Sequence, residues 1–384
     1  MTPISPFFPH AVLALLVAGT LLGCATSEVR DIEPGSDAEK LTPAQSRIWY
    51  QARKFDETLS NRDAIYVDPR LDNYLKSVME RLFPEFRGRI RVGVLKSSQL
   101  NAFALPNGSI YLNLGLLARM ENEAQLSMVL AHEAGHFIQQ HGLRQRQSAD
   151  GVAIAGIVVS VASGVPLSGN LMVAMAMSGY SQDFERAADR VGFERMLAAG
   201  YDPEQAAEVF RMMRAEVEAL DISQPFLYSS HPKLSERIES TSALAREAAV
   251  KSGERGEQRF IAHIAPLRAG LLESYLEERD YKRLILILED DKRRNDYPVY
   301  ADYYLGEAYR LRNEEGDRDR CAQAYQATLK KAPDFPYTYR ALGLMRMQDG
   351  EKSVAREHLQ TYLTLSPDAA DRGYIEGYLK KLAD

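Results

Sequence analysis

The pentapeptide His132-Glu133-Ala134-Gly135-His136 has the residue types and the spacing of a zinc-binding catalytic motif. Residues four apart share one face of an α-helix, so both imidazoles can point at a single metal ion. Glu133 lies one step round the helix, where its carboxylate can accept a proton from a water molecule that the metal activates. The pattern predicts a zinc metallopeptidase, and the alternative is a surface helix that happens to carry two histidines.

The residues around the motif predict the helix that it needs. Asn122 is a favourable N-cap with Gln125 three residues later, and apolar residues follow at helical spacing. His141 and Gly142 supply a C-terminal stop. Because His141 comes five residues after His136, it would lie on another face of the helix. We interpret His141 as a cation at the helix end rather than as a ligand.

A third metal ligand must come from elsewhere in the chain, because catalytic zinc takes three protein ligands and leaves one position for water. The best candidate is Glu185, which stands four residues before Asp189 and shares a helical face with it. Asp189 would accept a hydrogen bond from the far nitrogen of a liganding histidine and fix its orientation. Taken alone, such an acidic pair is typical of a solvated helix face.

The sequence HEAGH followed by ERAAD resembles the gluzincin metallopeptidases of the HtpX and Oma type. The resemblance implies that His132, His136 and Glu185 bind one zinc ion per chain. The family pattern also has an Asn-Ala-x-Ala-x-Pro-x-Gly segment before the zinc helix, and residues 101–108 match it. In family members an edge strand at this place holds an extended substrate backbone as an added strand. An ordinary turn is the alternative for residues 106–108.

A further match is the segment from Ser230 to Ile238, which is similar to the His-Pro element of the family. The resemblance implies two alternative roles for His231. It could donate a hydrogen bond to the oxyanion of the reaction, or it could be a fourth, inhibitory ligand of the zinc. A loop histidine without a role is the third alternative. The resemblance spans about residues 45 to 245.

Residues 1–23 predict export by a bacterial lipoprotein signal. They contain no charged side chain, and an apolar core at residues 11–22 leads to Cys24. We expect cleavage before Cys24 and lipid attachment to it, because the apolar stretch is too short to span a membrane. Ala25 after the cysteine favours the inner face of the outer membrane, which faces the periplasm. A plain cleaved signal peptide is the alternative, since the leader lacks Lys and Arg.

The overall composition excludes some classes of protein. The formal net charge is −6 and no basic stripe is present, which argues against nucleic-acid binding. With Cys24 lipidated, Cys321 is the other of the two cysteines, so no intrachain disulfide can form. The stability of the protein must therefore come from packed cores.

The composition also suggests how the mature chain is divided. We expect a polar tether at residues 24–45, a metallopeptidase domain at 46–250 and a repeat domain at 258–384. Within the peptidase domain, residues 151–182 carry no charged side chain. Glycine and proline interrupt this run, which indicates a buried or interfacial helix, and a cover over the active site is the alternative.

The carboxy-terminal third is charged, tyrosine-rich and repetitive. A Leu-Gly pair ending at Gly306 recurs at Gly343, and Pro333 recurs as Pro367. These positions fit the tetratricopeptide pattern, in which glycine lies where paired helices touch and proline ends the second helix. Such arrays present a concave groove for protein partners. An unrelated helical bundle is the alternative.

Together these features predict an α+β fold: a mainly helical zincin domain with a small antiparallel sheet, followed by an α-helical repeat domain. The combination resembles periplasmic gluzincins that carry such repeats and support outer-membrane β-barrel assembly. It implies a zinc endopeptidase that cleaves misfolded or stalled outer-membrane precursors, with the barrel-assembly machinery as a partner of the repeats. The alternative is a zinc-stabilised scaffold or holdase. The intact Glu133 favours the enzyme, because a scaffold could lose the proton shuttle without losing metal. A hydrolase of small molecules is disfavoured by the substrate strand and the repeats.

Overall fold

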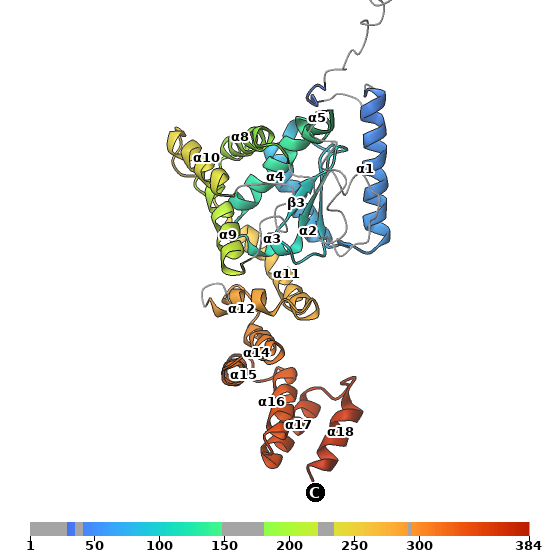
Figure 1. Ribbon diagram of the computed structural model, residues 1–384, viewed down its shortest axis with the longest axis vertical. Helices are drawn as coiled ribbons and strands as arrows, with labels where there is room; N and C mark the ends of the chain where they lie inside the picture. Colours follow the sequence, from blue (N-terminus) through green and yellow to red (C-terminus); the bar gives the residue numbers. More distant parts are fainter. Residues whose placement is uncertain (1–28, 35–40, 148–179, 222–233, 291–293, 384) are drawn as a thin grey trace, which may run out of the picture.

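A computed structural model describes residues 29–34, 41–147, 180–221, 234–290 and 294–383 (Figure 1). Three predictions concern segments outside these ranges. They are the lipoprotein leader with Cys24, most of the uncharged run, and the loop that carries His231.

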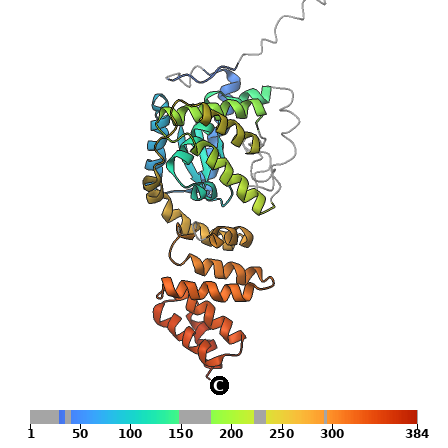
Figure 2. The same ribbon diagram turned by 90° about the vertical axis from the view of Figure 1, so that its left-hand side faces the viewer.

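The molecule is elongated, with an α/β unit at one end and a succession of helices leading away from it to the C-terminus (Figures 1 and 2). The helices of the α/β unit are α1 (Pro43–Asn61), α2 (Pro69–Leu82), η2 (Pro84–Phe86), α3 (Leu114–Arg119), α4 (Glu123–Ile138), α5 (His141–Gln147), α8 (Gln182–Ala198), α9 (Gln205–Ala219) and α10 (Leu234–Glu247). The helices that follow are α11 (Glu257–Glu277), α12 (Tyr281–Glu289), α14 (Ala301–Arg312), α15 (Asp317–Lys331), α16 (Pro336–Gln348), α17 (Lys352–Leu365) and α18 (Arg372–Lys381). The predicted α+β class with a helical C-terminal region is thereby confirmed.

A four-stranded sheet lies between α1 and α4 (Figure 1). Its strands, in spatial order, are β1 (Ile65–Tyr66), β2 (Arg91–Leu95), β4 (Ser109–Asn113) and β3 (Ala102–Ala104). β1 pairs antiparallel with β2, and β3 pairs antiparallel with β4, but β2 and β4 run parallel. The sheet is therefore mixed: the expected antiparallel pairing is found for β1–β2 and β3–β4 and is wrong for β2–β4. Residues 96–101 carry the chain past the position of β4 to the edge, so the β3–β4 hairpin returns β4 alongside β2 in the same direction.

The helix α4 begins where the sequence predicts it. The side chain of Asn122 accepts a hydrogen bond from the Gln125 backbone N–H at 3.0 Å, which caps the helix. Its end was predicted too late, because α4 ends at Ile138 and His141 already begins α5. Gln140 between them has a φ of 50°, a left-handed conformation that breaks the helix and redirects the chain.

The helices after residue 256 continue the core of the α/β unit. Buried apolar residues form one cluster that extends from the zinc-motif helix through α11 to the helices α14 and α15. Glycines lie where paired helices touch: a Cβ on Gly306 would be 2.5 Å from the ring of Tyr325, and one on Gly343 would be 2.6 Å from Leu359. These close contacts occur at the positions from which the repeat was predicted, and the assignment as tetratricopeptide repeats stays a prediction.

Candidate metal centre

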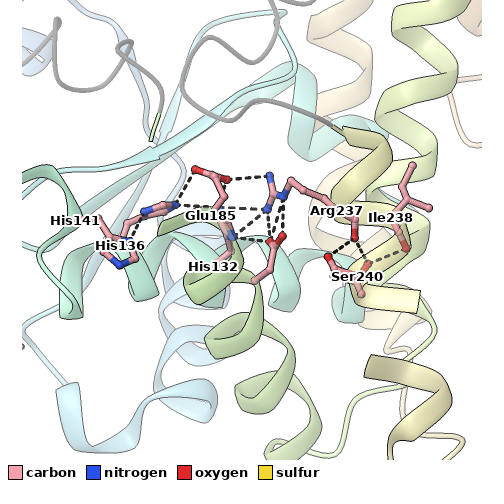
Figure 3. A network of polar contacts seen from close by, with 9 residues as sticks. His132, His136, His141, Glu185, Arg237, Ile238 and Ser240 are labelled. Carbon is pink, nitrogen blue, oxygen red and sulfur yellow. Dashed lines mark hydrogen bonds and ion pairs between the residues drawn. The ribbon is translucent and has the colours of Figure 1, made fainter. Parts of the chain in front are cut away.

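The structure brings the three predicted metal ligands together on two packed helices. α4 supplies His132 and His136, and α8 supplies Glu185 (Figure 3). The Nε2 atoms of the two histidines are 3.0 Å apart. The Glu185 carboxylate oxygens lie 3.6 Å from the Nε2 atom of His132 and 3.5 Å from that of His136. All three side chains are buried.

This geometry fits a zinc ion. Zinc binds imidazole nitrogen and carboxylate oxygen at about 2.0–2.2 Å, so tetrahedral ligands lie about 3.4 Å from one another. The separations of the three donor atoms bracket this value. Two histidines and one glutamate are also the donor set of a known class of catalytic zinc site. The residues present can therefore hold zinc without rearrangement of the two helices.

Small residues allow the two helices to approach closely enough. A Cβ added to Gly135 of α4 would lie 3.3 Å from the Ala188 Cα atom of α8. A Cβ added to Gly192 of α8 would lie 3.0 Å from the side chain of Met128. Larger side chains at these positions would separate the helices. The glycines therefore determine how near Glu185 comes to the two histidines.

A buried ion pair contacts His132 at the ring nitrogen that points away from the other candidate ligands. The Asp189 Oδ1 atom lies 2.9 Å from His132 Nδ1, the far nitrogen of the ring, as the sequence predicts. Arg237 of α10 donates to the same oxygen at 2.6 Å, and its guanidinium lies over the ring of Phe210 at 4.0 Å. Arg237 also lies 2.9 Å from His132 Nδ1. Asp189 is the acceptor that the histidine and the arginine share, and Arg237 balances its charge.

Sequence reasoning did not single out Arg237. It lies in the segment that resembles the His-Pro element, but an arginine near the start of an amphipathic helix is ordinarily solvated. Here it is buried, with 4% of its surface exposed. The only available signal was its place next to the apolar Ile238 on the helix that follows His231. His231 itself lies outside the described residues.

His141 differs from its prediction. Its Nδ1 atom lies 2.9 Å from His136 Nδ1, and its ring stacks on Phe184 with centroids 4.4 Å apart. Burial, with a smaller contribution from the charge of Arg144, lowers the pKa of His141 to about 4. The side chain is therefore neutral near pH 7, and the interpretation as a helix-end cation was wrong. The turn at Gln140 explains the difference, because it directs the imidazole back toward α4.

Glu133 and Tyr180 are two further side chains at the centre. Glu133 is buried on α4 between the two histidines of the motif. The ring of Tyr180 stacks on His136 with centroids 3.8 Å apart. Burial raises the pKa of Tyr180, and the negative charges of Glu133 and Glu185 raise it further. Tyr180 was not predicted, because it stands near the end of an uncharged segment without a recognisable motif.

The edge strand β3 lies beside the centre. Asn101 and Leu105 use their backbone groups to bond with β4, at 2.9 Å to Asn113 and 2.7 Å to Ser109. In an antiparallel pair the alternate residues point the other way, so the polar backbone groups of Ala102 and Ala104 face the outer edge of the sheet, which pairs with no further strand in the part of the chain that the structure describes. Ala104 lines a pocket together with His136. An extended chain added along this edge would pass next to the candidate metal site.

Residues 68–245 match the sequence profile of peptidase family M48. This part of the chain is an M48 peptidase domain. The predicted relationship to gluzincin metallopeptidases is thereby confirmed, and the domain is that of a metalloprotease. The matched region begins just before α2 and ends within α10. It therefore includes α4 and α8, the two helices of the candidate metal centre.

Curated relatives with M48-like sequences come from bacteria and mitochondria. The beta-barrel assembly-enhancing protease of Escherichia coli K12 is 28% identical over 186 residues, which are 44% of this chain and 38% of that protein. A candidate beta-barrel assembly-enhancing protease of Vibrio cholerae is 27% identical over 262 residues, 63% of this chain and 53% of its own length. The mitochondrial metalloendopeptidase OMA1 of Schizosaccharomyces pombe is 31% identical over 162 residues, 41% of this chain and 47% of the relative. The chain thus spans about half or less of the length of these relatives.

Among the residues that the structure describes, no helix is long and apolar enough to cross a membrane.

Proposed function

We propose that this protein is a zinc-dependent endopeptidase that cleaves misfolded or stalled outer-membrane proteins in the bacterial periplasm. The observation that carries the enzymatic part is the convergence of His132, His136 and Glu185 on one buried point beside a free strand edge. The substrate and the compartment are supported by the similarity to the beta-barrel assembly-enhancing proteases.

The chemistry follows from the roles that the residues can take. When bound, zinc lowers the pKa of a water molecule to about 7 and polarises the scissile carbonyl. Glu133 accepts the proton of the attacking water and passes it to the leaving amine. Asp189 and Arg237 keep the His132 ring in place during turnover. His231 is assigned either donation to the oxyanion or inhibitory binding of the metal.

The free edge of β3 is proposed to bind the substrate. Backbone hydrogen bonds from Ala102 and Ala104 would align an extended polypeptide without reading its side chains. This mode of binding suits a protease that selects unfolded chains, because folded substrates offer few unpaired strands. The helices from α11 to α18 would recruit partners, and the barrel-assembly machinery is the partner that we propose for them.

Cleavage of an unfolded polypeptide by the purified full chain tests the proposal. Casein should be cut by the protein as prepared, should survive after zinc is removed with a chelator, and should be cut again when zinc is restored. Cleavage that persists after complete metal removal would contradict the mechanism.

A Cys24→Ser variant tests the proposed compartment. It should lose both palmitate labelling and sedimentation with outer membranes if Cys24 anchors the protein.

The second candidate function is a zinc-stabilised scaffold or holdase. The helical region favours it, because the one group of side chains that could hold a metal among the described residues lies outside the helices α11 to α18, which would then act by binding. Metal binding without any cleavage of unfolded substrates would support this function over the endopeptidase.

A further inference from the structure

The two histidines of the zinc motif have different surroundings behind their rings. His132 faces the carboxylate of Asp189, which is itself paired with Arg237. His136 faces another imidazole, because its Nδ1 atom is 2.9 Å from the Nδ1 atom of His141. Metal-binding histidines generally donate the hydrogen of the second nitrogen to such an acceptor, which fixes the tautomer and the orientation of the ring.

The direction of this hydrogen bond follows from the metal site. If the Nε2 lone pair of His136 points at the metal, its Nδ1 atom must carry the hydrogen. His136 is then the donor, and the Nδ1 atom of His141 accepts with its lone pair. His141 therefore carries its own hydrogen on Nε2. This arrangement of protons makes the short contact between the two Nδ1 atoms a hydrogen bond.

The position of His141 is fixed from three sides. The left-handed turn at Gln140 aims it at α4, and Gln45 of α1 donates to the Gln140 side chain at 3.0 Å. Two residues further on, Leu143 is buried in an apolar cluster with residues of α1. The imidazole stacks on Phe184, the residue directly before Glu185 on α8. His141 thus contacts both helices that bear the metal ligands.

We propose that His141 is a positioning residue that holds His136 in the orientation needed for metal binding by accepting its Nδ1 hydrogen. The inference rests on the metal site proposed above. It also gives the centre an asymmetric support. His132 is backed by a carboxylate, whereas His136 is backed by an imidazole.

Two substitutions separate the hydrogen bond from the packing of the ring. His141→Phe keeps an aromatic ring against Phe184 but removes the acceptor. His141→Asn removes the ring but places a carbonyl oxygen close to the position of the histidine Nδ1 atom. His263→Phe is the matched control, because His263 stacks on Tyr74 in α2 and does not take part in the metal centre.

Zinc affinity, measured by competition with a chromophoric chelator on the full chain, is the readout. His141→Phe should weaken zinc binding about 10–100-fold, the usual effect of losing such a partner. His141→Asn should recover most of the affinity, and His263→Phe should bind like the parent. Equal thermal unfolding midpoints of the zinc-free proteins will show that folding is not the cause of the loss.

Two results would overturn the proposal. Parental zinc affinity in His141→Phe would show that His136 needs no acceptor. A loss in His141→Asn as large as that in His141→Phe would assign the effect to ring packing instead. A parent protein that binds no zinc at all would refute the metal site itself, which is a different outcome from either of these.

Discussion

In the candidate metal centre, His132 contacts two buried side chains that are not predicted ligands, Asp189 and Arg237. Asp189 supports His132, and Arg237 in turn neutralises Asp189. Burying the Asp189 carboxylate would be costly without such a cation, because unpaired charges are strongly disfavoured in a protein interior. The site therefore needs the arginine as much as it needs the aspartate.

At the scale of single residues, Asp189→Ala should weaken zinc binding about 10–100-fold, because His132 loses the acceptor that fixes its ring. Asp183→Ala on the same helix is the control, since Asp183 is exposed and pairs only with the half-exposed Arg186. Exposed pairs of this kind contribute little. Metal titration of both variants gives the comparison. Equal zinc affinities would remove Asp189 from the metal centre.

The helix of the motif and the candidate ligand Glu185 could be predicted from the sequence, the first from its local spacing and the second from the Glu-x-x-x-Asp pair that follows the motif. Asn122 as the N-cap and Glu185 four residues before Asp189 are local patterns. Arg237 and His141 could not be recognised in this way. The position of Arg237 depends on contacts between helices that are far apart in the sequence. The position of His141 depends on a left-handed turn at Gln140, which no local sequence pattern predicted.

At the scale of elements, the crossing of α4 and α8 is the structural basis of the site. The fold of this region could be predicted as helical, but the order of the strands could not, since only the tertiary arrangement places β4 between β2 and β3. The same holds for Gly135, which reads as one variable position of the zinc motif. In the structure a Cβ at this position would lie 3.3 Å from the Cα atom of Ala188, so Gly135 lies where α4 packs against α8.

Gly135→Leu should separate the two helices, because its side chain would collide with Ala188. Overpacking of this kind costs about 1–3 kcal/mol of unfolding free energy. It should also move Glu185 away from the histidines, so that zinc binding is lost. Gly270→Leu on α11 is the matched control, since no atom lies within 4 Å of an added Cβ there. Zinc content measured on the folded variants tests whether the helix separation abolishes metal binding. A zinc content of Gly135→Leu equal to that of the parent would contradict this prediction.

At the scale of the whole molecule, buried ion pairs join the M48 domain to the following helices. Glu216 of α9 lies 2.9 Å from Arg119 of α3 and 3.0 Å from Arg283 of α12. Arg119 also donates to the hydroxyl of Tyr275 in α11 at 2.7 Å. All four residues are buried, so this contact joins the two parts by matched polar groups as well as by apolar packing.

Glu216→Gln should destabilise the protein by about 3–5 kcal/mol, because the buried guanidinium of Arg119 loses its carboxylate partner and that of Arg283 keeps only Asp280. Glu218→Gln, two residues away on the same helix, removes an exposed carboxylate and should change stability little. Urea unfolding followed by circular dichroism compares the two. If they unfold at the same urea concentration, the buried pair does not hold the parts together.

The zinc content and the proteolytic activity of Glu133→Gln, measured on one preparation, test the central claim most directly. Glu133 is buried and directly follows His132 in the motif, and its proposed role is to move a proton rather than to bind the metal. The variant should bind about one zinc ion per chain and fail to cleave casein. Glu121→Gln, at an exposed position just before the helix, should keep both properties. Casein cleavage by Glu133→Gln at the rate of the parent would contradict the proposed peptidase mechanism.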